Sequence, residues 1–189
     1  MKKIIENISK LPKWYGLIIV AVYGILTTEY AKFVFNIVRN SSPDFSEIID
    51  TIIVATYVIG ILTAFATWIV GSLIFHITAL IFGGKQEWTV FLSSSAYSGI
   101  FLIVATIISI MLTENIQLNC RPEEIVSILQ SNEKVRMASA VMDGSTVLCL
   151  GVITIFVHYL YNIKWYKAML SVFLPTGTIY GICKIISIL

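Results

Sequence analysis

The chain has 189 residues, of which 57% are hydrophobic and 13% are charged, and its formal net charge is +2. A mean hydropathy of +0.87 excludes an ordinary soluble domain. The small net charge, without a basic cluster interleaved with aromatic residues, gives no support to nucleic-acid binding. Several apolar windows are long enough to cross a hydrocarbon core of about 30 Å. The composition therefore predicts an all-α, polytopic membrane helical bundle.

Residues 1–13 form a positively charged leader that ends near Pro12. No cleavage site of small residues follows, and the apolar run is too long for a signal peptide, so we expect an uncleaved first span from about Trp14 to Val38. Trp14 begins this span as an interfacial aromatic residue. We therefore expect a cytoplasmic leader over residues 1–13 and a single five-span membrane domain over residues 14–189.

Two charged residues, Glu29 and Lys32, interrupt the second half of the first span. They are three positions apart, so they share a helix face on which they can form an ion pair. Two interpretations stay open at this point. One is a pair at the outer interface with a snorkelling lysine, and the other is a buried polar site within the bundle.

The second apolar run extends from Ile52 to Phe82, about 31 residues, and would measure roughly 46 Å as a helix. This length exceeds one perpendicular crossing, so the run has to tilt, kink near Gly71, or leave the bilayer in its last third, where His76 lies. The sequence GGKQEW at residues 83–88 follows, and its glycines predict a tight turn between two spans.

A third span is expected over residues 91–112, with a serine patch that can hydrogen-bond to its own backbone or to a neighbouring helix. The longest polar segment, residues 113–139, comes next. Within it Ile125, Ile128 and Leu129 follow a proline at helical spacing, which predicts one short amphipathic helix outside the membrane.

Fourth and fifth spans are expected at about residues 140–161 and 166–188, joined by a tight turn. Pro175 and Gly177 predict a kink in the fifth span, where neighbouring helices can satisfy the freed backbone groups. Five spans place the two termini on opposite sides of the membrane.

The basic residues predict the orientation. The side of the amino terminus, which also holds the two short turns, has seven basic and two acidic residues, whereas the other side has six basic and nine acidic ones. Short loops with excess lysine and arginine stay cytoplasmic. We therefore expect a cytoplasmic amino terminus and an external carboxyl terminus in the cell membrane. The seven basic residues are Lys2, Lys3, Lys10, Lys13, Lys85, Lys164 and Lys167.

Ionisable residues in or near the spans are functional candidates, because their burial in a membrane is costly. We expect Asp143 in the first turn of the fourth span, where a carboxylate can cap backbone amides. We expect His158 at the interface, and His76 and Lys85 could both meet phosphate headgroups. None of these residues has a catalytic spacing.

The cysteines Cys120, Cys149 and Cys183 have no metal-site spacing, and neither a metal nor another cofactor is expected. Cys149 and Cys183 are interpreted as packing residues, whereas a disulfide between Cys120 and Cys183 stays open. Small residues in the second and third spans predict close helix packing, within the chain or with a partner helix. They are Gly60, Ala64, Gly71, Ser93, Ser94, Ser95, Gly99 and Ala105.

The stretch from residue 72 to residue 104 resembles the signature of the Yip family, the multi-spanning Yip-one-domain proteins named for interaction with Ypt and Rab GTPases. In that family a span ends in a segment with a histidine or small residues, a Phe-Gly-Gly-Lys turn and an aromatic residue follow, and an Ala-Tyr pair opens the next span. The matching residues here are His76, Phe82, Gly83, Gly84, Lys85, Trp88, Ala96 and Tyr97.

A second match is YLYNIKWYKAMLSVFLP, in which Lys167 and Ala168 follow the short turn and Pro175 comes later in the final helix. The resemblance covers about residue 52 to the end and agrees with the five-span count. In one departure, residues 99–101 are Gly-Ile-Phe where the family commonly has a proline.

The resemblance implies a non-enzymatic membrane adaptor or assembly factor. Eukaryotic members look like adaptors with long cytoplasmic amino-terminal regions, whereas about 13 residues precede the first span here, so we expect a compact prokaryotic-type member. Some bacterial members look like accessory proteins of ABC-type efflux or envelope-stress systems. The expected partners are membrane lipids and either another membrane protein or a second copy of this chain.

The alternative hypothesis is a small transporter or channel that uses Glu29, Lys32 and Asp143 as a polar path. Five spans without an inverted repeat match transporter architecture poorly. A third hypothesis, an intramembrane enzyme, has no residue spacing that supports it.

Overall fold

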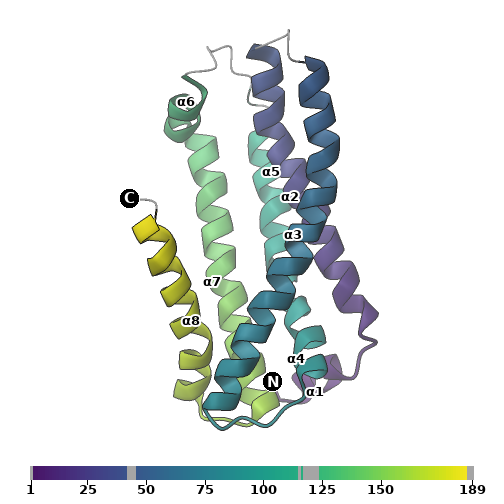
Figure 1. Cartoon of the computed structure of the whole chain (residues 1–189), viewed down its shortest axis with the longest axis vertical. Coiled ribbons are helices and arrows are strands. Elements are labelled where there is room, and N and C mark those ends of the chain that lie inside the picture. Colours follow the sequence, from purple (N-terminus) through teal and green to yellow (C-terminus); the bar gives the residue numbers. More distant parts are fainter. Residues whose placement is uncertain (1, 42–45, 115, 117–123, 187–189) are drawn as a thin grey trace. The chain divides into compact units, whose positions relative to one another are not determined.

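The computed structural model describes residues 2–41, 46–114, 116 and 124–186. All regular elements in these ranges are helices, and they form five helical segments long and apolar enough to cross a membrane, which confirms the predicted fold class. The helices, coloured along the sequence in Figure 1, are α1 (Lys2–Ser9), α2 (Trp14–Ser41), α3 (Ser46–Ile81), α4 (Trp88–Ser95), the 3-10 helix η2 (Ala96–Ser98), α5 (Gly99–Thr113), α6 (Ile125–Ser131), α7 (Glu133–Tyr161) and α8 (Trp165–Ile186).

The helices contribute to two units. The first unit consists of Met1–Ile19, Ala66–Gly99 and Leu148–Leu189, and it holds α1, α4 and α8 complete. The second consists of Val20–Phe65 and Ile100–Val147, and it holds most of α2 and α5. Because α2, α3 and α7 each continue from one unit into the other, the two units share their longest helices.

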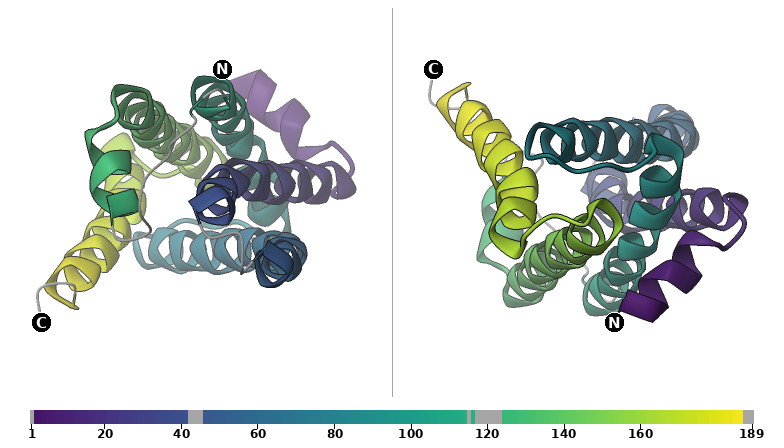
Figure 2. Two further views of the ribbon diagram at one scale, coloured as in Figure 1. Left: turned by 90° about the horizontal axis from the view of Figure 1, so that it is seen from above. Right: turned by 90° about the horizontal axis from the view of Figure 1, so that it is seen from below.

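Helix α1 was not predicted from the sequence, which indicated only a polar leader before Pro12. It packs beside α4, as the view from below in Figure 2 shows. Ile5 is buried, whereas Lys3 and Ile4 on other faces of the same helix are exposed. The buried Ile5 therefore contributes to the packing of α1, and the described residues contain two short helices, α1 and α6, besides the candidate spans.

The third predicted span is helical but interrupted. Three residues, Ala96–Ser98, form a 3-10 turn between α4 and α5. Serine hydroxyl groups bond to the carbonyl groups of their own helix here: Ser95 donates to Leu92 at 2.8 Å and Ser98 donates to Ser95 at 2.6 Å. Such local bonds compete with regular helix geometry and often bend a helix. The predicted bonding of the serine patch to its own backbone is confirmed.

The fourth span begins earlier than predicted, at Glu133 instead of near residue 140. Asn132 divides the polar segment, because its side-chain oxygen accepts hydrogen bonds from the backbone of Lys134 at 3.0 Å and of Val135 at 3.3 Å. This is an N-terminal cap of the kind that asparagine favours. Asp143 therefore lies almost three turns inside α7, and its predicted position in the first turn of that helix was wrong.

Two other expectations concern helix length and kinks. Helix α3 has 36 residues, more than the predicted run, and would measure about 54 Å. It is continuous through Gly71, and α8 is continuous through Pro175. Pro175 is buried in α8, and the kink expected there stays a prediction.

A disulfide between Cys120 and Cys183 stays an open question, because Cys120 lies outside the described residues.

In the second unit, α2 and α3 cross closely at small residues. A Cβ atom on Gly24 would lie 2.9 Å from the Cα atom of Ile61 and 3.2 Å from the Cβ atom of Ala64. A Cβ atom on Gly60 would collide with the hydroxyl group of Thr28. Close packing at Gly60 and Ala64 was predicted, and the structure shows that the residues of α2 packed against them are Gly24 and Thr28.

We expect Gly24→Ala to lower the stability of the purified protein in detergent by about 1–3 kcal/mol, because the added methyl group meets a backbone atom that has to move. The matched control is Gly71→Ala, where a Cβ atom has nothing within 4 Å. That change should be neutral or stabilising by up to about 1 kcal/mol, since alanine favours a helix over glycine. Equal thermal unfolding temperatures for the two variants would contradict the close crossing.

Candidate functional site

The two glycines of the GGKQEW turn cap the carboxyl end of α3 with their backbone N–H groups. The backbone N–H of Gly84 donates to the carbonyl of Ala79, and that of Gly83 donates to the carbonyl of Leu80, both at 2.9 Å. Gly83 has a φ of 90°, a backbone conformation that glycine adopts without steric cost. This pair of bonds is a Schellman motif. The predicted tight turn is therefore confirmed. The positive φ explains why glycine is favoured at position 83, the first glycine of the family signature.

The second glycine makes room for an aromatic ring. A Cβ atom on Gly84 would lie 2.7 Å from Cδ1 and 2.8 Å from Cβ of Tyr161, at the end of α7. Tyr161 is buried, its ring meets that of Phe91 edge-on with centroids 5.4 Å apart, and its hydroxyl group is hydrogen-bonded to Nδ1 of His76. The end of α7 is thus packed directly onto the turn after α3.

His76 belongs to this buried cluster. Its ring is hydrogen-bonded to Tyr161 and lies edge-on to Trp88, with centroids 5.6 Å apart. Lys85, by contrast, is exposed. The expectation that His76 and Lys85 together meet phosphate headgroups is therefore not supported, because His76 points into the protein and is paired there.

The second resemblance motif contacts the same turn. The Nζ atom of Lys167 donates a hydrogen bond of 3.0 Å to the carbonyl of Phe82, the residue directly after α3. Four residues earlier on α3, the hydroxyl group of Thr78 donates to the carbonyl of Ser171 at 2.7 Å. Ala168, on the same side of α8, is fully buried. Both halves of the family resemblance therefore meet around the end of α3.

A serine cluster joins α3 to α4. The hydroxyl groups of Ser72 and Ser95 are 2.8 Å apart, and the indole N–H of Trp68 donates to Ser95 at 3.1 Å. The thiol of Cys149 is buried and lies 3.2 Å from the Ser98 hydroxyl, consistent with its interpretation as a packing residue. Two further hydroxyl groups, those of Ser94 and Tyr97, are buried without a hydrogen-bond partner among the described residues.

The turn between α7 and α8 is closed by His158. Its Nδ1 atom is 2.6 Å from the carbonyl oxygen of Ile163, and its ring stacks on Trp165 with centroids 4.1 Å apart. Asn162 takes the left-handed backbone conformation that such a turn needs, with a φ of 53°. His158 therefore joins the two spans on either side of this turn, and its expected position at the membrane interface stays a prediction.

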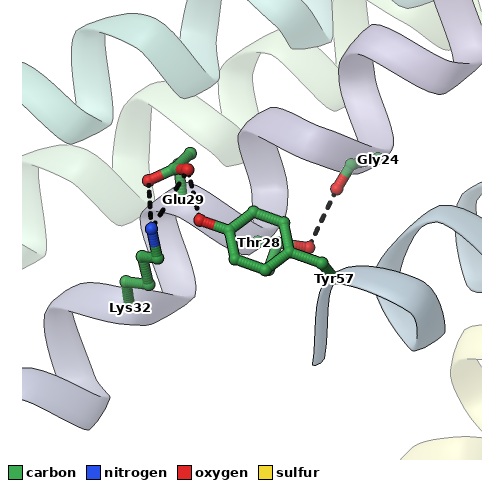
Figure 3. A network of polar contacts seen from close by, with 5 residues as sticks. All are labelled: Gly24, Thr28, Glu29, Lys32 and Tyr57. Carbon is green, nitrogen blue, oxygen red and sulfur yellow. Dashed lines mark hydrogen bonds and ion pairs between the residues drawn. The ribbon is translucent and has the colours of Figure 1, made fainter. Parts of the chain in front are cut away.

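In the second unit, the predicted ion pair of Glu29 and Lys32 is present at 3.2 Å (Figure 3). The hydroxyl group of Tyr57 on α3 donates a hydrogen bond to the same carboxylate, and Lys32 also lies over the Tyr57 ring, 4.7 Å from its centroid. A second ion pair, Arg39 with Asp50 at 3.3 Å, joins the end of α2 to the beginning of α3.

Both members of the Glu29–Lys32 pair are partly exposed, at 41% and 33% of their side-chain surface. They line a pocket of about 440 Å³, whereas the exposed Asp143 lines a different one with Arg136. The three residues of the hypothetical polar path are therefore not brought to one place. The described residues contain no group of three or more His, Cys, Asp or Glu side chains that could hold a metal ion.

Residues 2–187, nearly the whole chain, match the Yip1 domain. The chain belongs to the Yip1 domain family. The match also includes α1 and the first span, which lie before the region in which the sequence resemblance was noticed. No curated protein and no solved structure matches the chain. The two-glycine turn, His76 and Lys167 of this Yip1-domain protein thus lie in one packed cluster around the end of α3.

Sequence reasoning missed Tyr161, the residue around which that cluster is built. Its place in the second match and at the end of the fourth expected span does not indicate this packing role, because its partners Gly84 and His76 are far away in the sequence. The one available indication is its position directly before a short turn, on the side of the membrane where the turn at Gly83 and Gly84 is also expected.

We expect Tyr161→Phe to destabilise the purified protein by about 1–3 kcal/mol, because it leaves a buried histidine nitrogen without its partner. Tyr180→Phe is the matched control, since the Tyr180 side chain is exposed. Thermal unfolding in detergent measures both. In a double-mutant cycle, His76→Phe and Tyr161→Phe together should cost clearly less than the sum of the single changes; additive costs would mean that the two side chains do not interact.

Proposed function

We propose that this protein is a non-enzymatic membrane adaptor or assembly factor that binds another integral membrane protein. The observation that carries the proposal is the carboxyl-terminal part of α8. Between Thr176 and Ile186 no described residue is buried, although this part belongs to a candidate membrane span. The chain thus has a stretch of candidate membrane helix whose surface is mostly exposed.

Two glycines give this stretch a face suited to another helix. Gly177 and Gly181 are four positions apart, and a Cβ atom on either would have nothing within 4 Å. A pair of small residues at this spacing lets a second membrane helix approach closely, so that van der Waals contacts accumulate along the backbone. The glycines at Gly24 and Gly84 are, by contrast, already occupied by neighbours within the chain.

The distribution of polar residues favours an adaptor over the alternative of a transporter or channel. The buried polar side chains among the described residues are serines, threonines and His76, without a buried Asp, Glu, Lys or Arg. Glu29 and Lys32 neutralise each other, and Asp143 lines another pocket. A continuous path for a charged substrate would need such groups along one route.

We further propose that the protein resides in the cell membrane with its amino terminus in the cytoplasm and its carboxyl terminus outside. The exposed lysines Lys85 and Lys164 at the two short turns support this orientation. Membrane components of ABC-type efflux or envelope-stress systems are the candidate partners that the family resemblance implies. A second copy of this chain is the other candidate.

We expect crosslinking in native membranes, followed by affinity capture, to recover a stoichiometric membrane-protein partner with the unaltered chain. The double variant Gly177→Leu, Gly181→Leu should reduce this recovery by at least about tenfold, because two bulky side chains keep the partner helix at a distance. Quantitative mass spectrometry of the captured material measures the change.

The matched control is Gly71→Leu, the same substitution at a glycine that also has open space but lies on α3. It should leave recovery unchanged, and all variants should keep the unfolding temperature of the unaltered chain. Capture of nothing except the bait, without a crosslinked product of two copies of the chain, would contradict the adaptor. Ion or solute flux in proteoliposomes that falls with Glu29→Gln or Asp143→Asn would favour the transporter instead.

The orientation has its own prediction. In a background without the three native cysteines, Lys164→Cys should resist a membrane-impermeant maleimide in intact cells and react after permeabilisation, because its turn faces the cytoplasm. Ser131→Cys, exposed at the end of α6, should react in intact cells. The reverse pattern would invert the proposed topology.

A further inference from the structure

The pocket beside Glu29 and Lys32 has a composition that points to a ligand. It has a volume of about 440 Å³ and lies between the carboxyl-terminal part of α2 and the end of α5. Its wall combines apolar side chains, such as Phe33 and Ile110, with the charged groups of Glu29, Lys32 and Glu114. A pocket with both kinds of surface suits an amphipathic molecule.

The charges of the pocket do not balance. Glu29 and Lys32 form an ion pair and cancel in net charge. Glu114 is exposed and has no ion-pair partner among the described residues, so the described lining of the pocket has one negative charge in excess. A ligand that brings a cationic group to Glu114 would remove this excess. Lys32 at the same time offers an ammonium group to an anionic part of the ligand.

The depth of these groups fits the headgroup region of a bilayer. Glu114 comes directly after Thr113, where the third candidate span ends. Lys32 lies five residues before Ile37, where the first candidate span ends, which places its Cα atom about 7.5 Å further in. The cationic and anionic groups of the ligand are therefore expected at different depths, next to an apolar wall that can hold acyl chains.

We propose that this pocket binds a zwitterionic phospholipid whose headgroup carries a primary ammonium group, that is, a phosphatidylethanolamine. The ammonium group donates hydrogen bonds to Glu114, and the phosphate lies toward Lys32 and the exposed amide of Asn36. A phosphatidylcholine has no N–H donor for Glu114, and a phosphatidylglycerol would add a negative charge to a pocket that already has an excess. This lipid site is independent of the proposed adaptor function.

The test uses the full chain, purified in detergent and mixed with equal amounts of phosphatidylethanolamine, phosphatidylcholine and phosphatidylglycerol that have the same acyl chains. Native mass spectrometry counts the lipids that remain bound. The unaltered chain should retain phosphatidylethanolamine in preference to the other two. Glu114→Gln should reduce that retention roughly fivefold, the size expected from one exposed charge contact. Glu133→Gln, at another exposed carboxylate, should leave it unchanged.

Equal retention of the three lipids by the unaltered chain would overturn the proposal, as would equal retention of phosphatidylethanolamine by the chain and by Glu114→Gln. A Glu114→Gln variant that keeps its lipid but loses a captured partner would also overturn it, because the pocket would then hold a cationic side chain of that partner. A preference for phosphatidylethanolamine together with failed partner capture would count against the adaptor function alone.

Discussion

The contact of the Tyr161 ring with Gly84 is the constraint on which one end of the molecule depends. Position 84, in the turn after α3, has to be glycine, because a Cβ atom there would collide with the Tyr161 ring. In this position the ring places its hydroxyl group within hydrogen-bonding distance of the buried His76. This single side chain joins the end of α7 to both sides of the turn between α3 and α4. Because the ring, the glycine and the histidine are mutually dependent, a change in any one of them disturbs the other two.

Much of the remaining packing follows from the cost of leaving polar groups unpaired in a membrane. Hydroxyl groups such as those of Thr28, Thr106 and Thr154 bond to a carbonyl in the preceding turn of their own helix, at 2.8–3.0 Å. A few, notably Thr78 and Ser109, reach a carbonyl of another helix. Serine and threonine hydroxyl groups are thus mostly hydrogen-bonded within their own helix, and these side chains are small enough for neighbouring helices to pack closely. The shortest distances between helices occur at glycines.

The hydropathy pattern predicted the five spans and the two short turns, and the three-residue spacing predicted the ion pair of Glu29 and Lys32. These features depend on near neighbours in the sequence. The 3-10 turn at Ala96–Ser98, the start of α7 at Glu133 and the burial of His76 were not predicted. The first two depend on capping and competing side-chain bonds, and the third depends on Tyr161, 85 residues further along the chain.

The hydrogen bond from Lys167 to the carbonyl of Phe82 has an electrostatic consequence. The carboxyl end of a helix carries about half a negative elementary charge from its aligned peptide dipoles, and the ammonium group lies against that end of α3. The ammonium group of Lys167 therefore stabilises the carboxyl end of α3 in addition to joining α8 to it. Of the lysines near the two short turns, Lys85 and Lys164 are exposed, whereas Lys167 is half-buried.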